Sequence, residues 1–222
     1  MTNMSSMRSS KISDIEKLHQ DPGYRQILKL EFSDMIPFVL SNIRKKGLFS
    51  ILYLTINMAS LVFIILYAIW GVMDMQITWA TIIKQTLSGI FAGSILVIPL
   101  HEILHGLAYR ILGARKIKFG ADLQQFIFFV TADRYPVSGN QLYFLAMTPF
   151  VVINLVTVAI TTLVFPQVIL FAAFLLLSHN IMCIGDFAIV NFVRLTPGRI
   201  ITYDETEQKR SYFFEEVVDQ PE

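Results

Sequence analysis

The chain has 222 residues, of which 54% are hydrophobic and only 16% are charged. Soluble domains carry about 25% charged residues, so this composition indicates that lipid is the main solvent of the protein. The net charge of +1 gives no electrostatic basis for binding nucleic acid, and we expect no such partner. The single cysteine, Cys183, excludes an internal disulfide framework and any zinc site built from several cysteines.

The N-terminal part of the chain is polar or mixed in character. Its first 17 residues lack the apolar core of a signal peptide, so we expect no cleavage there. Residues 30–46 mix apolar and basic side chains, which favours a segment lying flat on the membrane surface. The sequence therefore predicts a cytoplasmic and interfacial segment over residues 1–46.

Four charge-poor segments are each long enough for a transmembrane helix, because about 20 apolar residues of helix cross the hydrocarbon core. They are residues 47–73, 85–109, 141–165 and 167–195. The last two come from one uncharged stretch that is too long for a single crossing and is divided at Pro166. The sequence thus predicts an all-α polytopic membrane protein with about four transmembrane helices.

We expect the membrane domain, which carries the metal site, to occupy residues 47–200. Seventeen of the 18 lysines and arginines fall on one side of a four-span arrangement, and only Lys84 falls on the other. Because cytoplasmic loops carry the excess of basic residues, both termini are predicted to be cytoplasmic. Residues 117–132 are β-prone and predict short strands at the interface. Residues 201–222 are expected to form a loosely ordered cytoplasmic tail.

His101, Glu102 and His105 fit the pattern H-E-x-x-H inside the second span. Residues i and i+4 share one face of a helix, so two imidazoles can hold one zinc ion while the glutamate reaches a bound water as general base. An ionisable residue at membrane depth costs at least about 2.5–3.5 kcal/mol, which favours a function for this turn. The alternative is a satisfied polar cluster between helices.

Asp186 is the candidate for the third zinc ligand. It is the only acid between Arg134 and Arg194. His101 lies nine residues before Arg110 and Asp186 eight before Arg194, so each lies roughly 12–14 Å from its basic end. Both helices are predicted to run toward the cytoplasm, which brings the two residues to one level. The alternative for Asp186 is a hydrogen-bonding role without metal.

Several other polar or small residues have weaker signals. His179 is a reserve ligand, a proton relay, or an interhelical hydrogen-bonding residue that lies toward the outer side. Asn154 is expected either to orient substrate or bind an oxyanion, or to join helices, and Cys183 is expected to be a small buried residue. Gly185 is expected to allow close helix approach, and Pro149 to kink the third span.

Four short motifs carry a resemblance to a known family. They are HEILHG at 101–106, ILG at 111–113, TPF at 148–150 and CIGD at 183–186. Over residues 85–195 the chain resembles the small, mostly bacterial membrane proteins called "putative zincin peptidases", and more broadly the site-2-protease class of intramembrane metalloproteases. It differs from site-2 proteases in having glycine before the ligand aspartate, and in lacking their G-P-x-x-N element.

The resemblance implies Zn²⁺ held by His101, His105 and Asp186, with Glu102 as general acid and base in peptide-bond hydrolysis. It also implies an integral protein of a bacterial cell membrane, whose partners are the lipid bilayer and a membrane-protein or peptide substrate. A non-proteolytic metal-binding or scaffold protein with a degenerate zincin site is the alternative. Transport is a weaker one, because no inverted repeat is evident.

Overall fold

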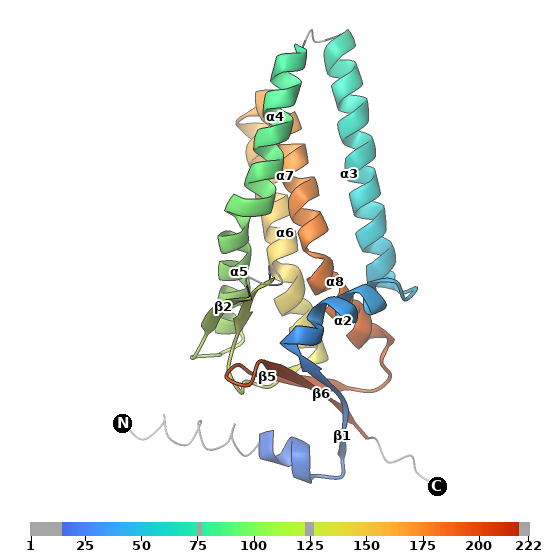
Figure 1. Ribbon diagram of the computed structural model, residues 1–222, viewed down its shortest axis with the longest axis vertical. Helices are drawn as coiled ribbons and strands as arrows, with labels where there is room; N and C mark the ends of the chain where they lie inside the picture. The colour runs from blue at the N-terminus through green and yellow to red at the C-terminus, as the bar shows by residue number, and fades with distance from the viewer. Residues whose placement is uncertain (1–14, 75–76, 123–126, 218–222) are drawn as a thin grey trace.

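The computed structural model describes residues 15–74, 77–122 and 127–217. The predictions for residues 1–14 and for the end of the tail, 218–222, lie outside the described residues. The described part is mostly helical, with a bundle of long helices above a small sheet (Figure 1).

The long helices follow the apolar segments of the sequence. They are α3 (Leu48–Met73), α4 (Trp79–Phe91), α5 (Val97–Ile111), α6 (Gly139–Leu163), α7 (Ile169–Met182) and α8 (Ile184–Leu195). Three continuous helices are long and apolar enough to cross a membrane, namely α3, residues 79–111 and α6, within the part of the chain that is described. The pair α7–α8 adds a fourth if its two halves count as one span.

Two of the helical segments are irregular near the polar residues. A π-helical turn, η2 (Ala92–Leu96), joins α4 to α5. Pro99 follows it and cannot donate to Ile95, so a wider turn relieves the clash of the proline ring with that carbonyl. The fourth predicted span is not straight, because α7 and α8 meet at a 47° bend at Cys183. The bend places Asp186 in the first turn of α8, where the helix dipole favours a carboxylate.

Glycines set how closely α4 and η2 approach α7. A Cβ atom at Gly89 would lie 2.5 Å from the Phe171 carbonyl oxygen, and one at Gly93 would lie 2.3 Å from the Leu175 carbonyl oxygen. Gly185 has no atom within 4 Å of its Cβ position. The prediction that Gly185 allows close helix approach is therefore wrong, because its Cβ position faces open space.

A four-stranded antiparallel sheet corrects the all-α prediction. It contains β1 (Tyr24–Glu31), β4 (Val137–Ser138), β5 (Ile200–Glu205) and β6 (Arg210–Glu216), in the order β1-β6-β5-β4. The prediction of a loosely ordered tail is wrong for residues 201–205 of β5 and for β6, because both are ordered strands. Successive side chains of these strands face opposite sides of the sheet. Phe213 packs in the core below the helices, whereas Phe214 packs against Ile15 and Leu18 on the opposite face.

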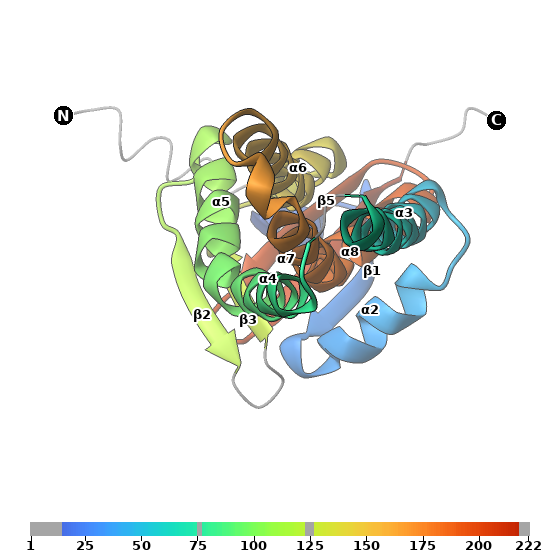
Figure 2. The same cartoon turned by 90° about the horizontal axis from the view of Figure 1, so that it is seen from above.

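Two further elements surround the end of the bundle near the sheet. The strands β2 (Lys118–Asp122) and β3 (Ile127–Thr131) pair antiparallel, which confirms that this segment forms short strands. The short η1 (Phe32–Asp34) leads into α2 (Met35–Ile43), which packs on α8. Seen from above, α5 and the hairpin lie on one side of the bundle, and α2 and α3 lie on the other (Figure 2).

Candidate metal centre

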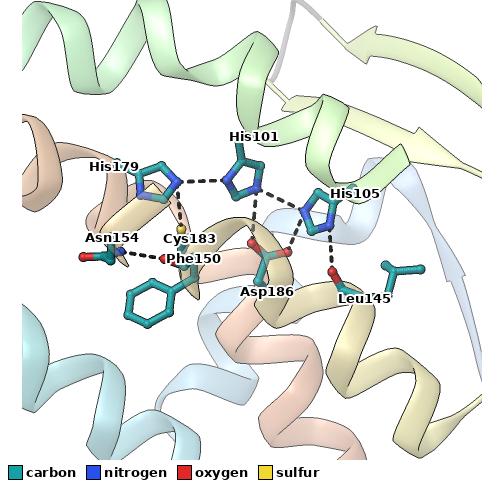
Figure 3. A network of polar contacts seen from close by, with 8 residues as sticks. All are labelled: His101, His105, Leu145, Phe150, Asn154, His179, Cys183 and Asp186. Carbon is teal, nitrogen blue, oxygen red and sulfur yellow. Dashed lines mark hydrogen bonds and ion pairs between the residues drawn. The ribbon is translucent and has the colours of Figure 1, made fainter. Parts of the chain in front are cut away.

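Helices α5 and α8 bring the three predicted zinc ligands together (Figure 3). The Nε2 atoms of His101 and His105 are 3.1 Å apart. The Asp186 carboxylate places Oδ2 at 3.3 Å from the first of these atoms and Oδ1 at 3.3 Å from the second. Ligand atoms at about 2.0–2.1 Å from a tetrahedral zinc ion lie about 3.3–3.4 Å from one another. The donor set and its spacing therefore fit zinc.

A backbone carbonyl fixes the orientation of His105. The ring Nδ1 lies 3.0 Å from the carbonyl oxygen of Leu145 on α6. Because a carbonyl only accepts, Nδ1 carries the proton, and the lone pair is on Nε2, which faces Asp186. The Leu145 carbonyl lacks its usual helical donor, since position 149, four residues later, is a proline. Pro149 thus leaves this carbonyl available to His105, a role different from the kink predicted for it.

His179 on α7 forms a hydrogen bond that orients the ring of His101. Its Nε2 lies 3.1 Å from Nδ1 of His101, and its side chain is buried. When the lone pair of His101 faces the site, its Nδ1–H donates to His179. The prediction that His179 lies too far toward the outer side is wrong, because α7 brings it into direct contact with His101. Cys183 is buried as expected, with Sγ 3.6 Å from the same His179 nitrogen.

Glu102 lies on the wall of a cavity of about 490 Å³ that also reaches the three ligand residues. Its carboxylate makes no hydrogen bond or ion pair with any residue that the structure describes. The cavity walls are largely apolar and come from α2, β3, α6 and α8. Glu102 is thus free to accept a proton in a space large enough for a peptide segment.

Asn154 does not reach this cavity. Its Nδ2 donates to Asn180 Oδ1 at 2.8 Å, and Asn180 returns a bond to Asn154 Oδ1 at 3.2 Å. This reciprocal amide pair joins α6 to α7 beside the site. Of the two roles predicted for Asn154, the helix-joining one is observed, and its partner Asn180 was missed by the sequence reasoning.

A second polar group at the sheet end of the cavity was also missed. The half-buried carboxyl of Asp204 on β5 accepts a bond from Ser211 Oγ at 2.6 Å and one from the Tyr109 hydroxyl at 3.3 Å. Burial raises the pKa of this carboxyl, the two hydrogen bonds oppose the rise, and the nearby Asp133 adds to it. Tyr109 falls on the same helical stripe as His101 and His105, a spacing that identifies it from sequence.

Residues 94–201 match a protein family described as "Putative zincin peptidase". The matched part is just under half of the chain and contains all of the H-E-x-x-H motif and Asp186. The match supports the resemblance to putative zincin peptidases seen in the sequence, and the family description suggests a zinc metallopeptidase. No curated protein and no solved structure gave a match to the chain.

Proposed function

We propose that the protein is a membrane-embedded zinc metallopeptidase that hydrolyses peptide bonds of membrane or membrane-proximal substrates. The observation that carries this proposal is the convergence of two histidine nitrogens and the Asp186 carboxylate, with contacts of 3.1–3.3 Å, beside Glu102 in one cavity. The zincin peptidase family supports the same chemistry.

The surface of the bundle supports insertion in a membrane. Large apolar side chains are exposed along α3, among them Leu54, Leu66 and Met73, although soluble proteins bury most such residues. Strand β1 carries Arg25 and Lys29 at the sheet end of the molecule, whereas Lys84 lies on α4 at the far end (Figure 1). The excess of basic residues favours a cytoplasmic location for the sheet and both termini.

Each polar side chain of the site has a separate task in the proposed reaction. His101, His105 and Asp186 would hold the zinc ion, with the two imidazoles oriented by His179 and the Leu145 carbonyl. Zinc supplies Lewis acidity, which polarises a peptide carbonyl and lowers the pKa of water. Glu102 accepts a proton from the attacking water. As the new C–O bond forms and the C–N bond breaks, Glu102 returns that proton to the leaving amine.

The substrate must present an extended backbone, because a helix hides its carbonyl groups in internal hydrogen bonds. Residues 128–131 of β3 line the cavity, and among the described residues β3 pairs only with β2. The free edge of β3 offers backbone donors and acceptors to an extended segment. We propose that the substrate pairs there with its scissile carbonyl facing the ligand residues.

Metal analysis with matched variants tests the proposal. Detergent-purified protein is expected to contain about one zinc ion per chain by plasma mass spectrometry, and His101→Ala and Asp186→Ala are expected to lose it. Glu102→Gln is expected to keep zinc and to lose hydrolysis of any substrate found, whereas the exposed Glu207→Gln keeps both.

Two results would change the conclusion. Well-folded wild-type protein without metal would indicate a polar cluster that only joins helices. Zinc binding with an unchanged physiological output in Glu102→Gln would indicate a non-proteolytic metal-binding or scaffold protein.

A further inference from the structure

The cavity beside the metal centre has a second polar end. From His105 it continues along α5 to Tyr109 and ends against β5 and β6, where Asp204 and Ser211 line it. The walls between the two ends are mainly apolar and include Val39, Leu142 and Ile189. The cavity therefore connects the candidate zinc site to the carboxyl group of Asp204.

Asp204 has no cationic partner among the described ion pairs. The basic residues of neighbouring segments pair elsewhere, with Arg134 at 3.8 Å from Glu205 and Arg210 at 3.2 Å from Glu31. Even partial burial of a carboxylate without a counter-ion is costly, and such groups in clefts are candidates for functional sites. Its two hydrogen bonds use about half of the four acceptor positions of a carboxylate, so it can accept further donors.

The distance between the two ends suits a short stretch of peptide. His105 and Tyr109 are four residues apart on one face of α5, which corresponds to about 6 Å along the helix. Asp204 lies beyond the Tyr109 hydroxyl, so the carboxylate is on the order of 10 Å from the metal ligands. An extended chain rises about 3.3 Å per residue, and roughly three residues therefore separate the two ends.

We propose that Asp204, with Tyr109 and Ser211, forms a subsite that binds a cationic group of the substrate, the ammonium of lysine or the guanidinium of arginine. This inference rests on the proposed function and adds a substrate class to it. The favoured substrate has an apolar segment at the scissile bond and a basic residue about three positions away.

The raised pKa of the Asp204 carboxyl agrees with this role. It indicates that the charged carboxylate is poorly solvated and has no positive charge beside it in the free protein. The competing explanation is structural, with Asp204 serving only to tie the end of α5 to the sheet. The two explanations differ for Asp204→Asn. The amide keeps the shape and its hydrogen-bonding capacity, but it removes the charge that a cation would bind.

The first experiment measures ligand binding without any hydrolysis. Zinc-loaded protein in nanodiscs is titrated with butylammonium, and with 1-butanol as a neutral probe of equal length, by saturation-transfer NMR. We expect butylammonium to bind about 10-fold more weakly to Asp204→Asn than to wild type, because charge-assisted hydrogen bonds are about twice as strong as neutral ones. Butanol binding is expected not to change, and Glu102→Gln is expected to bind like wild type.

Equal butylammonium binding by wild type and Asp204→Asn would overturn the subsite. Asp204→Glu guards against a folding artefact, because it keeps a carboxylate at this position and is expected to bind butylammonium more tightly than Asp204→Asn; equal binding by these two variants in folded protein would also count against the proposal. A second experiment compares cleavage of two matched peptides with lysine or norleucine three positions from the scissile bond. Ammonium binding that needs Asp204, in a protein that cleaves neither peptide, would refute only the peptidase function.

Discussion

Replacing Pro149 with alanine tests how the backbone of α6 controls the metal centre. Alanine supplies the N–H that proline lacks, and in a regular helix this N–H bonds the carbonyl four residues earlier. That carbonyl belongs to Leu145, which now accepts the Nδ1–H of His105 at 3.0 Å. The new donor competes for the same oxygen, so His105 loses part of the interaction that directs its lone pair toward the metal.

The size of the effect follows from one hydrogen bond. A neutral hydrogen bond contributes about 0.5–1.5 kcal/mol, which corresponds to about 2- to 12-fold in zinc affinity. The carbonyl has two lone pairs and can accept a second donor, so the effect is expected in the lower part of this range. Alanine is a better helix residue than proline by about 3 kcal/mol in a helix interior. Zinc binding is therefore expected to weaken while the melting temperature stays constant or rises.

Competition with a chelator of known affinity measures this change in purified protein. Thr148→Ala is the matched control, because it removes a neighbouring side-chain bond to the Phe144 carbonyl and leaves Leu145 untouched. Zinc affinity in Pro149→Ala equal to that of wild type would refute the reasoning. A lower affinity together with a lower melting temperature would point to damage to the fold instead.

Three further predictions concern packing, orientation and charge. Gly93→Ala should lower the melting temperature, because its Cβ would lie 2.3 Å from a backbone oxygen, whereas Gly185→Ala, with no atom within 4 Å, should leave it unchanged. His179→Ala should weaken zinc binding by about 10-fold in the same competition assay, and an unchanged affinity would show that His101 needs no partner. Asp204→Asn should raise the melting temperature at pH 8 more than at pH 4. The folded pKa of this carboxyl is raised, so its ionisation destabilises the fold as the pH rises through and above its usual value, and a pH series of melts measures this.

The sequence singles out the three candidate ligand residues that the structure brings together, because their signals are local or follow from depth. H-E-x-x-H needs only one helical turn, and counting residues from the basic ends placed Asp186 at the level of His101. The bend at Cys183 was not predictable in this way. It depends on packing between α7, α8 and their neighbours, and no proline marks it.

The sheet was missed because its strands are far apart in the sequence. Strand β1 pairs with β6, with Tyr24 opposite Glu216, and this register depends on the folded helices between them. An acidic, short segment after the last span reads as a tail when it is considered alone. The run of three β-prone aromatic residues, Tyr212, Phe213 and Phe214, was a usable signal for a strand.

The role of Pro149 was missed for a different reason. Sequence reasoning assigns a proline in a helix to a kink, whereas its effect here is exerted at Leu145, whose carbonyl becomes available to another helix. Which side chain uses that oxygen is decided by the packing of α5 on α6, and this packing is not visible in either segment alone.

The proposed orientation of the protein in the membrane and the proposed cation subsite at Asp204 together predict where a substrate is cleaved. His101 lies ten residues, or about 15 Å, from the end of α5, whereas Asp204 lies on β5 and contacts Tyr109, two residues before that end. If the sheet is cytoplasmic, a substrate helix that unwinds into the cavity has its apolar residues near the metal ligands and its cytoplasmic flank near Asp204. Membrane proteins concentrate lysine and arginine in that flank. Cleavage is therefore expected a few residues inside the basic flank, on the apolar side, and moving that flank along a model substrate should move the cut with it.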